Sequence, residues 1–176
     1  MRFLFHLIGL GALAATGWYP ARAETAGGIR WTAPGGWKAQ PPRPMRAATY
    51  VVPAAAGDRE DAECVAYYFG AGQGGGVEDN VNRWLGQFQE AEARSAAKRS
   101  KQTFAGLPGT IVDVSGTYTG AGGPMAAAKT AKPGYRMLAA IVEAPEAPVF
   151  FKFTGPAKTV AAHLAAFHSM LKSVTR

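Results

Sequence analysis

Few residues of this chain have the type and spacing that catalysis requires. The side chains that could act as an acid, a base or a nucleophile are Asp113, Glu143, His163, His168 and the single cysteine, Cys64. The two histidines are five residues apart in an expected helix, about 140° around its axis, so they cannot converge on one ligand. Asp113 lies between two valines and either faces solvent or is satisfied by Arg136 or a nearby backbone group. We therefore predict no catalytic residues, and a hydrolase that uses Asp113, Glu143, His163 or His168 is the alternative.

The cysteine count and the composition limit the class of protein further. Cys64 lies inside an expected strand, where a small buried thiol is the usual role. One cysteine excludes an intrachain disulfide and a Cys-rich zinc site. The 176 residues are 48% hydrophobic and 18% charged, with 22 Gly and 12 Pro, which indicates one folded domain rich in loops and strands.

Two loops carry partial ligand-binding motifs. Gly70–Gly75 matches G-x-G-x-x-G between an expected strand and an expected helix, but the helix opens with Glu78 and Asp79, which would repel a pyrophosphate. We interpret this run as a flexible turn and expect no cofactor. The acidic turn at Asp58–Glu63 lacks the spacing of a calcium loop, so we expect a solvated turn and no metal site.

Basic residues are in excess, and some of them form a local cluster. The formal net charge is +7, and Arg94, Lys98, Arg99 and Lys101 lie close together in what we interpret as a connection. This cluster is either a solvated cationic face or a site for a polyanion. No nucleic-acid module is recognisable, so the expected partners exclude nucleic acid and include an anionic envelope polymer.

The first residues have the layout of a secretory signal. Arg2 precedes an apolar run from Phe3 to Ala15, and Ala21-Arg22-Ala23 follows. The run is too short to span a bilayer, which takes about 20 residues. We predict a cleaved signal peptide at 1–23 and a single mature domain at 24–176, periplasmic or secreted, without a transmembrane anchor.

The mature chain predicts strands before and after a central helix. Ile29–Trp31, Met45–Val52, Ala62–Phe69, Thr110–Thr119, Tyr135–Glu143 and Val149–Thr154 are the expected strands. Tyr135–Glu143 is apolar on both of its alternating faces, so it requires cover on both sides. We expect an α+β fold, an antiparallel sheet of about five to seven strands with helices packed on it.

Two helices are predicted from apolar spacing. Val77, Val81, Trp84, Leu85 and Phe88 share one face, and so do Val160, Leu164, Phe167, Leu171 and Val174. Glu24–Gly28 is expected to be a linker. The bland segment 119–134 is either a flexible hairpin connection or a binding loop.

Three blocks of sequence carry a resemblance to known proteins. They are Trp31–Trp37 with Pro41–Arg46, Ala66–Gly70 through Asn82–Phe88, and Phe150–Pro156. Together they resemble a set of uncharacterised exported bacterial proteins without an assigned activity. Some of those proteins are lipoproteins, whereas this chain has Glu24, and not a cysteine, directly after the predicted signal. More distantly, the order of elements resembles the PsbP fold, an α/β/α sandwich, which implies a protein-binding or assembly role without catalysis.

The sequence as a whole favours an exported, non-catalytic binding or interaction module. The absence of converging catalytic residue types supports this, as do Trp31 and Trp37 outside the periodic elements. Its partner is expected to be an envelope protein or an anionic envelope polymer, and the alternatives are an envelope hydrolase and a small-ligand carrier. The candidate interaction surface consists of Gly72, Arg83, Gln87, Lys129, Lys132 and Lys152.

Overall fold

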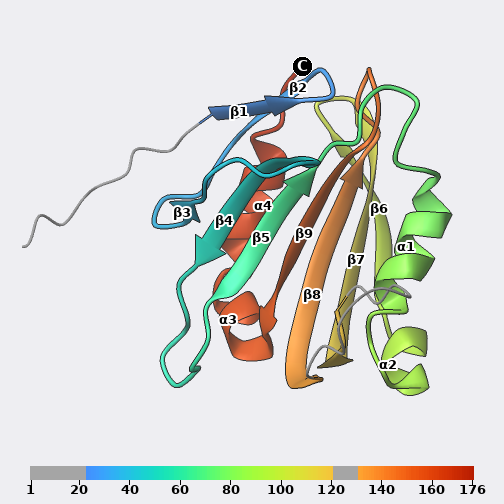
Figure 1. The fold of residues 1–176 in the computed structure, drawn as a ribbon. Helices are drawn as coiled ribbons and strands as arrows, with labels where there is room; N and C mark the ends of the chain where they lie inside the picture. The colour runs from blue at the N-terminus through green and yellow to red at the C-terminus, as the bar shows by residue number, and fades with distance from the viewer. Residues whose placement is uncertain (1–22, 121–130) are drawn as a thin grey trace, which may run out of the picture.

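Seven strands form one antiparallel sheet in the computed structural model, which describes residues 23–120 and 131–176. The strand order across the sheet is β3-β4-β5-β9-β8-β7-β6 (Figure 1). The predicted α+β class and the predicted number of strands are confirmed. The strands are β3 (Lys38–Ala39), β4 (Arg46–Val52), β5 (Ala62–Tyr67), β6 (Lys98–Phe104), β7 (Leu107–Tyr118), β8 (Lys132–Val142) and β9 (Val149–Pro156).

Strand β8 lies between β7 and β9 and is buried on both faces, as its sequence requires. Its apolar side chains alternate between two hydrophobic clusters, with Met137, Ala139 and Ile141 in one and Leu138, Ala140 and Val142 in the other. Because successive side chains of a strand point to opposite faces, the two clusters lie on the two sides of the sheet. Each side has its own helices (Figure 1).

Helices α1 (Val77–Leu85) and α2 (Ala91–Ser95) cover part of one side of the sheet. Helix α1 buries Val81, Trp84 and Leu85, and the apolar spacing of these residues predicted that face correctly. Phe88 lies beyond the end of the helix but packs into the same cluster. We call this side, which carries Met137 and Phe150, the α1 face.

Helices α3 (Ala157–Ala162) and α4 (Leu164–Lys172) cover the opposite side, the α4 face, which carries Leu138 and Phe151. The single C-terminal helix expected from the sequence is interrupted at His163, where φ is −102° and ψ is 10°. The ring of this histidine is hydrogen bonded to groups outside the helices, which ties the break to the rest of the fold. Val160, Phe167 and Leu171 are buried as their spacing predicted.

The two tryptophans offered in support of an interaction surface are buried in the α4 face instead. Trp31 is fully buried, and its Nε1 donates to the hydroxyl of Tyr50 at 3.1 Å. Trp37 is 5% exposed, and its ring packs against Phe153 at a centroid distance of 5.3 Å. Both residues are anchors of the core, because contacts from distant segments enclose them.

Two segments expected to be connections are strands. The expected linker 24–28 forms most of β1 (Ala23–Ala26) and the turn before β2 (Ile29–Thr32), and the two strands pair as a separate hairpin. The basic segment expected to be a connection contains the end of α2 and the start of β6. Strand β6 pairs with β7 along its whole length, which explains its extended conformation despite its polar sequence.

Candidate ligand-binding sites

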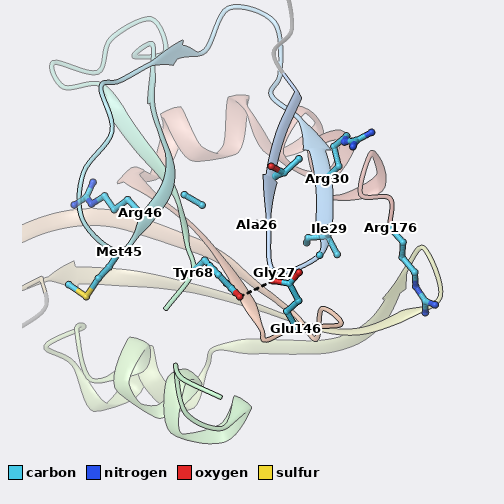
Figure 2. A pocket seen from close by; sticks show the side chains of 12 residues that line it. Ala26, Gly27, Ile29, Arg30, Met45, Arg46, Tyr68, Glu146 and Arg176 are labelled. Atoms are coloured by element: carbon cyan, nitrogen blue, oxygen red, sulfur yellow. Dashed lines mark hydrogen bonds between the residues drawn. The ribbon is translucent and has the colours of Figure 1, made fainter. Parts of the chain in front are cut away.

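A cavity with a volume of about 680 Å³ lies beneath the β1–β2 hairpin. Its walls come from the hairpin, from residues 45–47 at the start of β4, and from Tyr68, Glu146 and Arg176, which are far apart in the sequence (Figure 2). We call this cavity the hairpin pocket. Cavities of several hundred Å³ are the usual size for sites that bind small molecules.

Local backbone geometry shapes both sides of the hairpin pocket. Gly27 and Gly28 occupy the hairpin turn with φ of 61° and 79°, a region that favours glycine. A Cβ on Gly27 would lie 2.8 Å from the carbonyl oxygen of Ala147, so the turn also needs glycine for its close packing. On the opposite side, Met45 adopts a positive φ of 62° and its side chain is 66% exposed.

Charges in the hairpin pocket are arranged unevenly. Figure 2 shows Arg30 and Arg176 on one side of the cavity and Met45 and Arg46 on the other. Arg46 is committed to an ion pair with Glu63, whereas Arg30 has no side-chain partner among residues 23–120 and 131–176. The rim beside Arg30 is therefore the side that is ready to receive an anionic group.

A tyrosine and a carboxylate lie between these two sides. The hydroxyl of Tyr68 donates to Oε2 of Glu146 at 3.1 Å (Figure 2). Desolvation raises the pKa of Tyr68 above 10.0, and the hydrogen bond with Glu146 raises it further. The phenol of Tyr68 stays neutral at physiological pH and donates to the Glu146 carboxylate. This hydrogen bond lessens the repulsion between Glu146 and a bound anion.

A second, smaller cavity brings together three residues of the predicted interaction surface. Arg83, Gln87 and Lys152 line a space of about 160 Å³ between α1 and strands β5 and β9. The rest of its lining is aromatic and consists of Tyr67, Phe69, Trp84 and Phe150. We call it the aromatic pocket.

Lys152 is the polar centre of the aromatic pocket. Its ammonium group donates to the side-chain oxygen of Gln87 and, at 2.9 Å, to the hydroxyl of Tyr118. It also lies 5.1 Å from the centroid of the Tyr118 ring, within the range of a cation–π interaction. Burial raises the pKa of Tyr118 to about 12. Gln87 is itself buried, so it holds Lys152 in place from inside the cavity wall.

The other residues of the predicted surface are dispersed. Lys132 forms an ion pair with Glu60 and donates to the hydroxyl of Tyr135 at 3.0 Å. The hydrogen bonds that Glu60 accepts from Lys132 and from the Tyr135 hydroxyl lower the pKa of Glu60. Gly72 lies in the glycine-rich loop with φ of 70°, and no atom would lie within 4 Å of an added Cβ. Lys129 lies outside the described residues, as does most of the segment 119–134.

The groups considered for catalysis do not converge. Asp113 accepts two hydrogen bonds from Arg136, at 2.8 and 2.6 Å, which is one of the two arrangements expected for it. His163 accepts from Nε1 of Trp37 at 3.4 Å and donates to the carbonyl oxygen of Pro53 at 3.1 Å. Glu143 is exposed at the end of β8, and His168 contacts the ring of Phe167. No two of these four groups share a contact in the described part of the chain.

Cys64 and the acidic turn have structural partners in place of ligands. Cys64 is fully buried as predicted, and burial raises the pKa of its thiol well above the usual value. The acidic side chains of the segment 58–63 diverge: Asp58 accepts from Thr159, Asp61 accepts from the backbone of Ala54, and Glu63, in β5, pairs with Arg46. The described residues contain no group of three His, Cys, Asp or Glu that could hold a metal ion.

The glycine-rich loop is closed by a residue of α1. The side-chain amide of Asn80 donates to the carbonyl oxygens of Gly74, at 2.7 Å, and Gly76, at 2.8 Å. Glu78, in the first turn of α1, is paired with Arg99 of β6. The N-terminus of this helix thus already has an acidic residue, as its sequence indicated.

The architecture described above is the PsbP-like fold, which confirms the distant resemblance seen in the sequence. The solution structure of cyanobacterial PsbP (CyanoP) from Synechocystis sp. PCC 6803 matches with a TM-score of 0.52 at 12% identity, over 94% of this chain and 98% of that chain. Protein PA94 of unknown function from Pseudomonas aeruginosa matches with a TM-score of 0.49 at 15% identity, over 89% and 96%. The likeness to CyanoP, at 12% identity, establishes the fold alone, and no residue role is transferred.

No protein-family model matches the sequence, and no curated protein matches it. The helices in the described part of the chain are all too short or too polar to cross a lipid bilayer.

Proposed function

We propose that this chain is an exported, non-catalytic binding module that holds a small amphiphilic anion in the hairpin pocket. The observation that carries the proposal is the pocket itself, about 680 Å³ in volume and assembled from five separate segments of the chain. A protein with such a site is a binding module, as the sequence predicts, and its ligand is a small molecule, as in the alternative of a small-ligand carrier.

The chemistry of the walls supports this class of ligand. Ala26, Ala47 and the Met45 side chain supply apolar surface, and Ile29 lies beneath them. Arg30 supplies a guanidinium group on the rim, which suits a carboxylate or a phosphate. A molecule with an apolar body and one anionic head would satisfy both parts of the site.

The dispersed positions of the acids and histidines support a role without catalysis. General acid–base chemistry requires donor and acceptor groups within hydrogen-bond reach of one reacting centre. Asp113 and His163 are each engaged by structural partners on different elements. Export rests on the signal-like segment 1–23, and mass analysis of the secreted protein for an N-terminus at Glu24 tests it.

Retention of a natural ligand tests the binding function. The mature protein is incubated with a solvent extract of bacterial envelopes, washed, and analysed by native mass spectrometry. We expect a retained anionic small molecule in the wild type and a loss of about tenfold or more in retention in Ala47→Trp, which fills the cavity. Arg59→Gln is the matched control for Arg30→Gln, because Arg59 is an exposed arginine of the β4–β5 connection, and this connection lies at the end of the sheet opposite the β1–β2 hairpin (Figure 1).

The arginine pair separates head-group recognition from general charge. Arg30→Gln is expected to weaken retention about tenfold, the loss typical of one charge-assisted hydrogen bond, and Arg59→Gln to leave it unchanged. Equal retention by wild type and Ala47→Trp, or no retained molecule in either, contradicts the proposal.

A further inference from the structure

Strand β6 is an edge of the sheet, and among the described residues it has no partner on its outer side. It pairs only with β7, and no other element of the described chain continues the ladder beyond it. Six consecutive residues, 98–103, are exposed, and only Phe104 turns into the core. Edges of this length present unpaired N–H and C=O groups that another chain can use as a template.

The register identifies which backbone groups point outward. β6 and β7 are joined by a two-residue turn, Ala105–Gly106, with φ of 50° and 78°, so Phe104 and Leu107 close the hairpin as a hydrogen-bonded pair. Hydrogen-bonded and non-hydrogen-bonded pairs alternate from there. Arg99, Lys101 and Thr103 therefore direct their N–H and C=O groups away from β7.

Two observations agree with this register. Pro108 lies opposite Thr103, and its carbonyl oxygen accepts from the N–H of Glu143 at 2.9 Å, so the backbone of Pro108 faces β8 and not β6. Outside the strand ladders, no backbone hydrogen bond within residues 23–120 and 131–176 involves Arg99, Lys101 or Thr103, so no other segment occupies these groups. The outer edge thus offers three donors and three acceptors in an extended row.

The charge on this edge restricts what can pair with it. Lys98, Arg99 and Lys101 follow one another in β6, and no Asp or Glu occurs between Glu92 and Asp113. Arg99 has a partner in Glu78, but Lys98 and Lys101 have no carboxylate partner in the described part of the chain. A second copy paired through β6 would set cations against cations, which disfavours self-association.

We propose that the outer edge of β6 docks an extended acidic segment of a partner protein as an added strand. Backbone hydrogen bonds to Arg99, Lys101 and Thr103 supply the affinity, as in other cases of strand addition. Lys98 and Lys101 select acidic side chains, and the same charges prevent pairing with neutral or basic strands. None of the residues of this surface lines the hairpin pocket, so peptide binding is measured without a ligand in the pocket.

The first test uses a synthetic peptide of Glu and Thr that is as long as β6 and places glutamates on both faces of the added strand, because Lys98 and Lys101 lie on opposite faces of β6. Amide hydrogen exchange of the mature protein, followed by NMR, provides an internal control. In the free protein we expect slow exchange at Ser100 and Gln102, which face β7, and fast exchange at Arg99, Lys101 and Thr103. Saturating peptide should slow exchange at those three amides by at least tenfold. Binding that leaves their exchange unchanged, or no binding of the peptide, overturns the proposal.

The second test separates strand addition from simple charge attraction. Thr103→Pro removes one outward N–H group while it keeps every charge, and proline is tolerated at an edge position whose N–H faces solvent. We expect this variant to bind the peptide about tenfold more weakly than wild type, and Thr103→Val, which keeps the N–H, to bind as wild type does. Equal affinity of all three proteins overturns the proposal.

Two further experiments cover a variant that does not fold and binding by charge attraction alone. If Thr103→Pro fails to fold by circular dichroism, a peptide methylated on alternate backbone nitrogens replaces it, and it should also bind about tenfold more weakly. Polygalacturonate, an anionic polysaccharide without a peptide backbone, should leave the exchange of Arg99, Lys101 and Thr103 unchanged. Protection of these amides by the polysaccharide as strong as that by the peptide overturns strand addition.

Discussion

The two faces of the sheet differ in the proportion of apolar and polar side chains that they carry. The α4 face is packed almost entirely with buried aromatic and aliphatic side chains, including Trp31, Phe151, Phe153 and Phe167. The α1 face has a smaller apolar cluster and beside it a row of polar groups that includes Tyr118, Tyr135 and Lys152. The comparison indicates that one face carries most of the stability and the other can hold polar side chains for recognition.

The difference follows from which strands each helix covers. Helix α3 packs on β8 and β9 in the middle of the sheet, and α4 reaches the β1–β2 hairpin. Helices α1 and α2 contact β7, nearer one edge. On the α1 face, strands β5 and β9 carry Tyr67 and Lys152, and both side chains are only partly buried. Each takes part in a cation–π contact, Tyr67 with Arg46 and Lys152 with Tyr118.

Truncation of a matched aromatic residue on each face gives the largest expected difference. Phe153 is fully buried and contacts the rings of Trp37 and Phe167, so Phe153→Ala should lower the free energy of unfolding by about 3–5 kcal/mol. Phe69 lies partly exposed on the α1 face, and Phe69→Ala should cost about 1 kcal/mol. Urea denaturation measures both, and equal losses would contradict the division of roles between the faces.

A single methyl group tests how tightly the α4 face is packed. A Cβ on Gly155 would lie 2.3 Å from Cβ of Ala62 and 2.8 Å from its Cα, so the backbone of β5 would have to move. We expect Gly155→Ala to cost about 1–3 kcal/mol, the usual range for overpacking. Gly35→Ala is the control because no atom lies within 4 Å of its Cβ position. Similar urea midpoints for the two variants would show a loosely packed face.

Features with a repeating apolar pattern could be predicted from the sequence. Helix α1 and the two-sided burial of β8 follow from such patterns, because each buries side chains at a regular period. Strand β6 could not be found in this way. Its residues 98–103 are exposed on both faces, so nothing in packing requires apolar residues at alternate positions.

The sites depended on contacts that sequence alone does not reveal. Arg83, Gln87 and Lys152 were all expected on one interaction surface, but only the fold shows that these three line one pocket. The hairpin pocket combines segments around residues 27, 46, 68, 146 and 176, and no local motif marks their meeting. Trp31 and Trp37 were misplaced for the same reason, since distant strands and α4 bury them.

The smallest expected effect concerns a tyrosine of the α1 face at alkaline pH. Burial raises the pKa of Tyr118 in the folded protein from 10.0 to about 12. Between these values the unfolded chain releases the phenolic proton while the folded chain retains it, so the folded state binds more protons. The stability associated with this group is therefore fully present below pH 10 and is lost as the pH rises toward 12.

Tyr118→Phe removes this titration and keeps the ring that packs against Phe88 and Tyr135. Wild type should lose stability more steeply than the variant between pH 10 and 12, as measured by urea denaturation at each pH, with the difference at pH 7 as the baseline. Parallel stability curves would mean that Tyr118 ionises as freely as an exposed phenol. The polar row of the α1 face would then be open to water, and the contrast with the sealed α4 face would be greater than the structure indicates, because the hydroxyl to which Lys152 donates would be solvated.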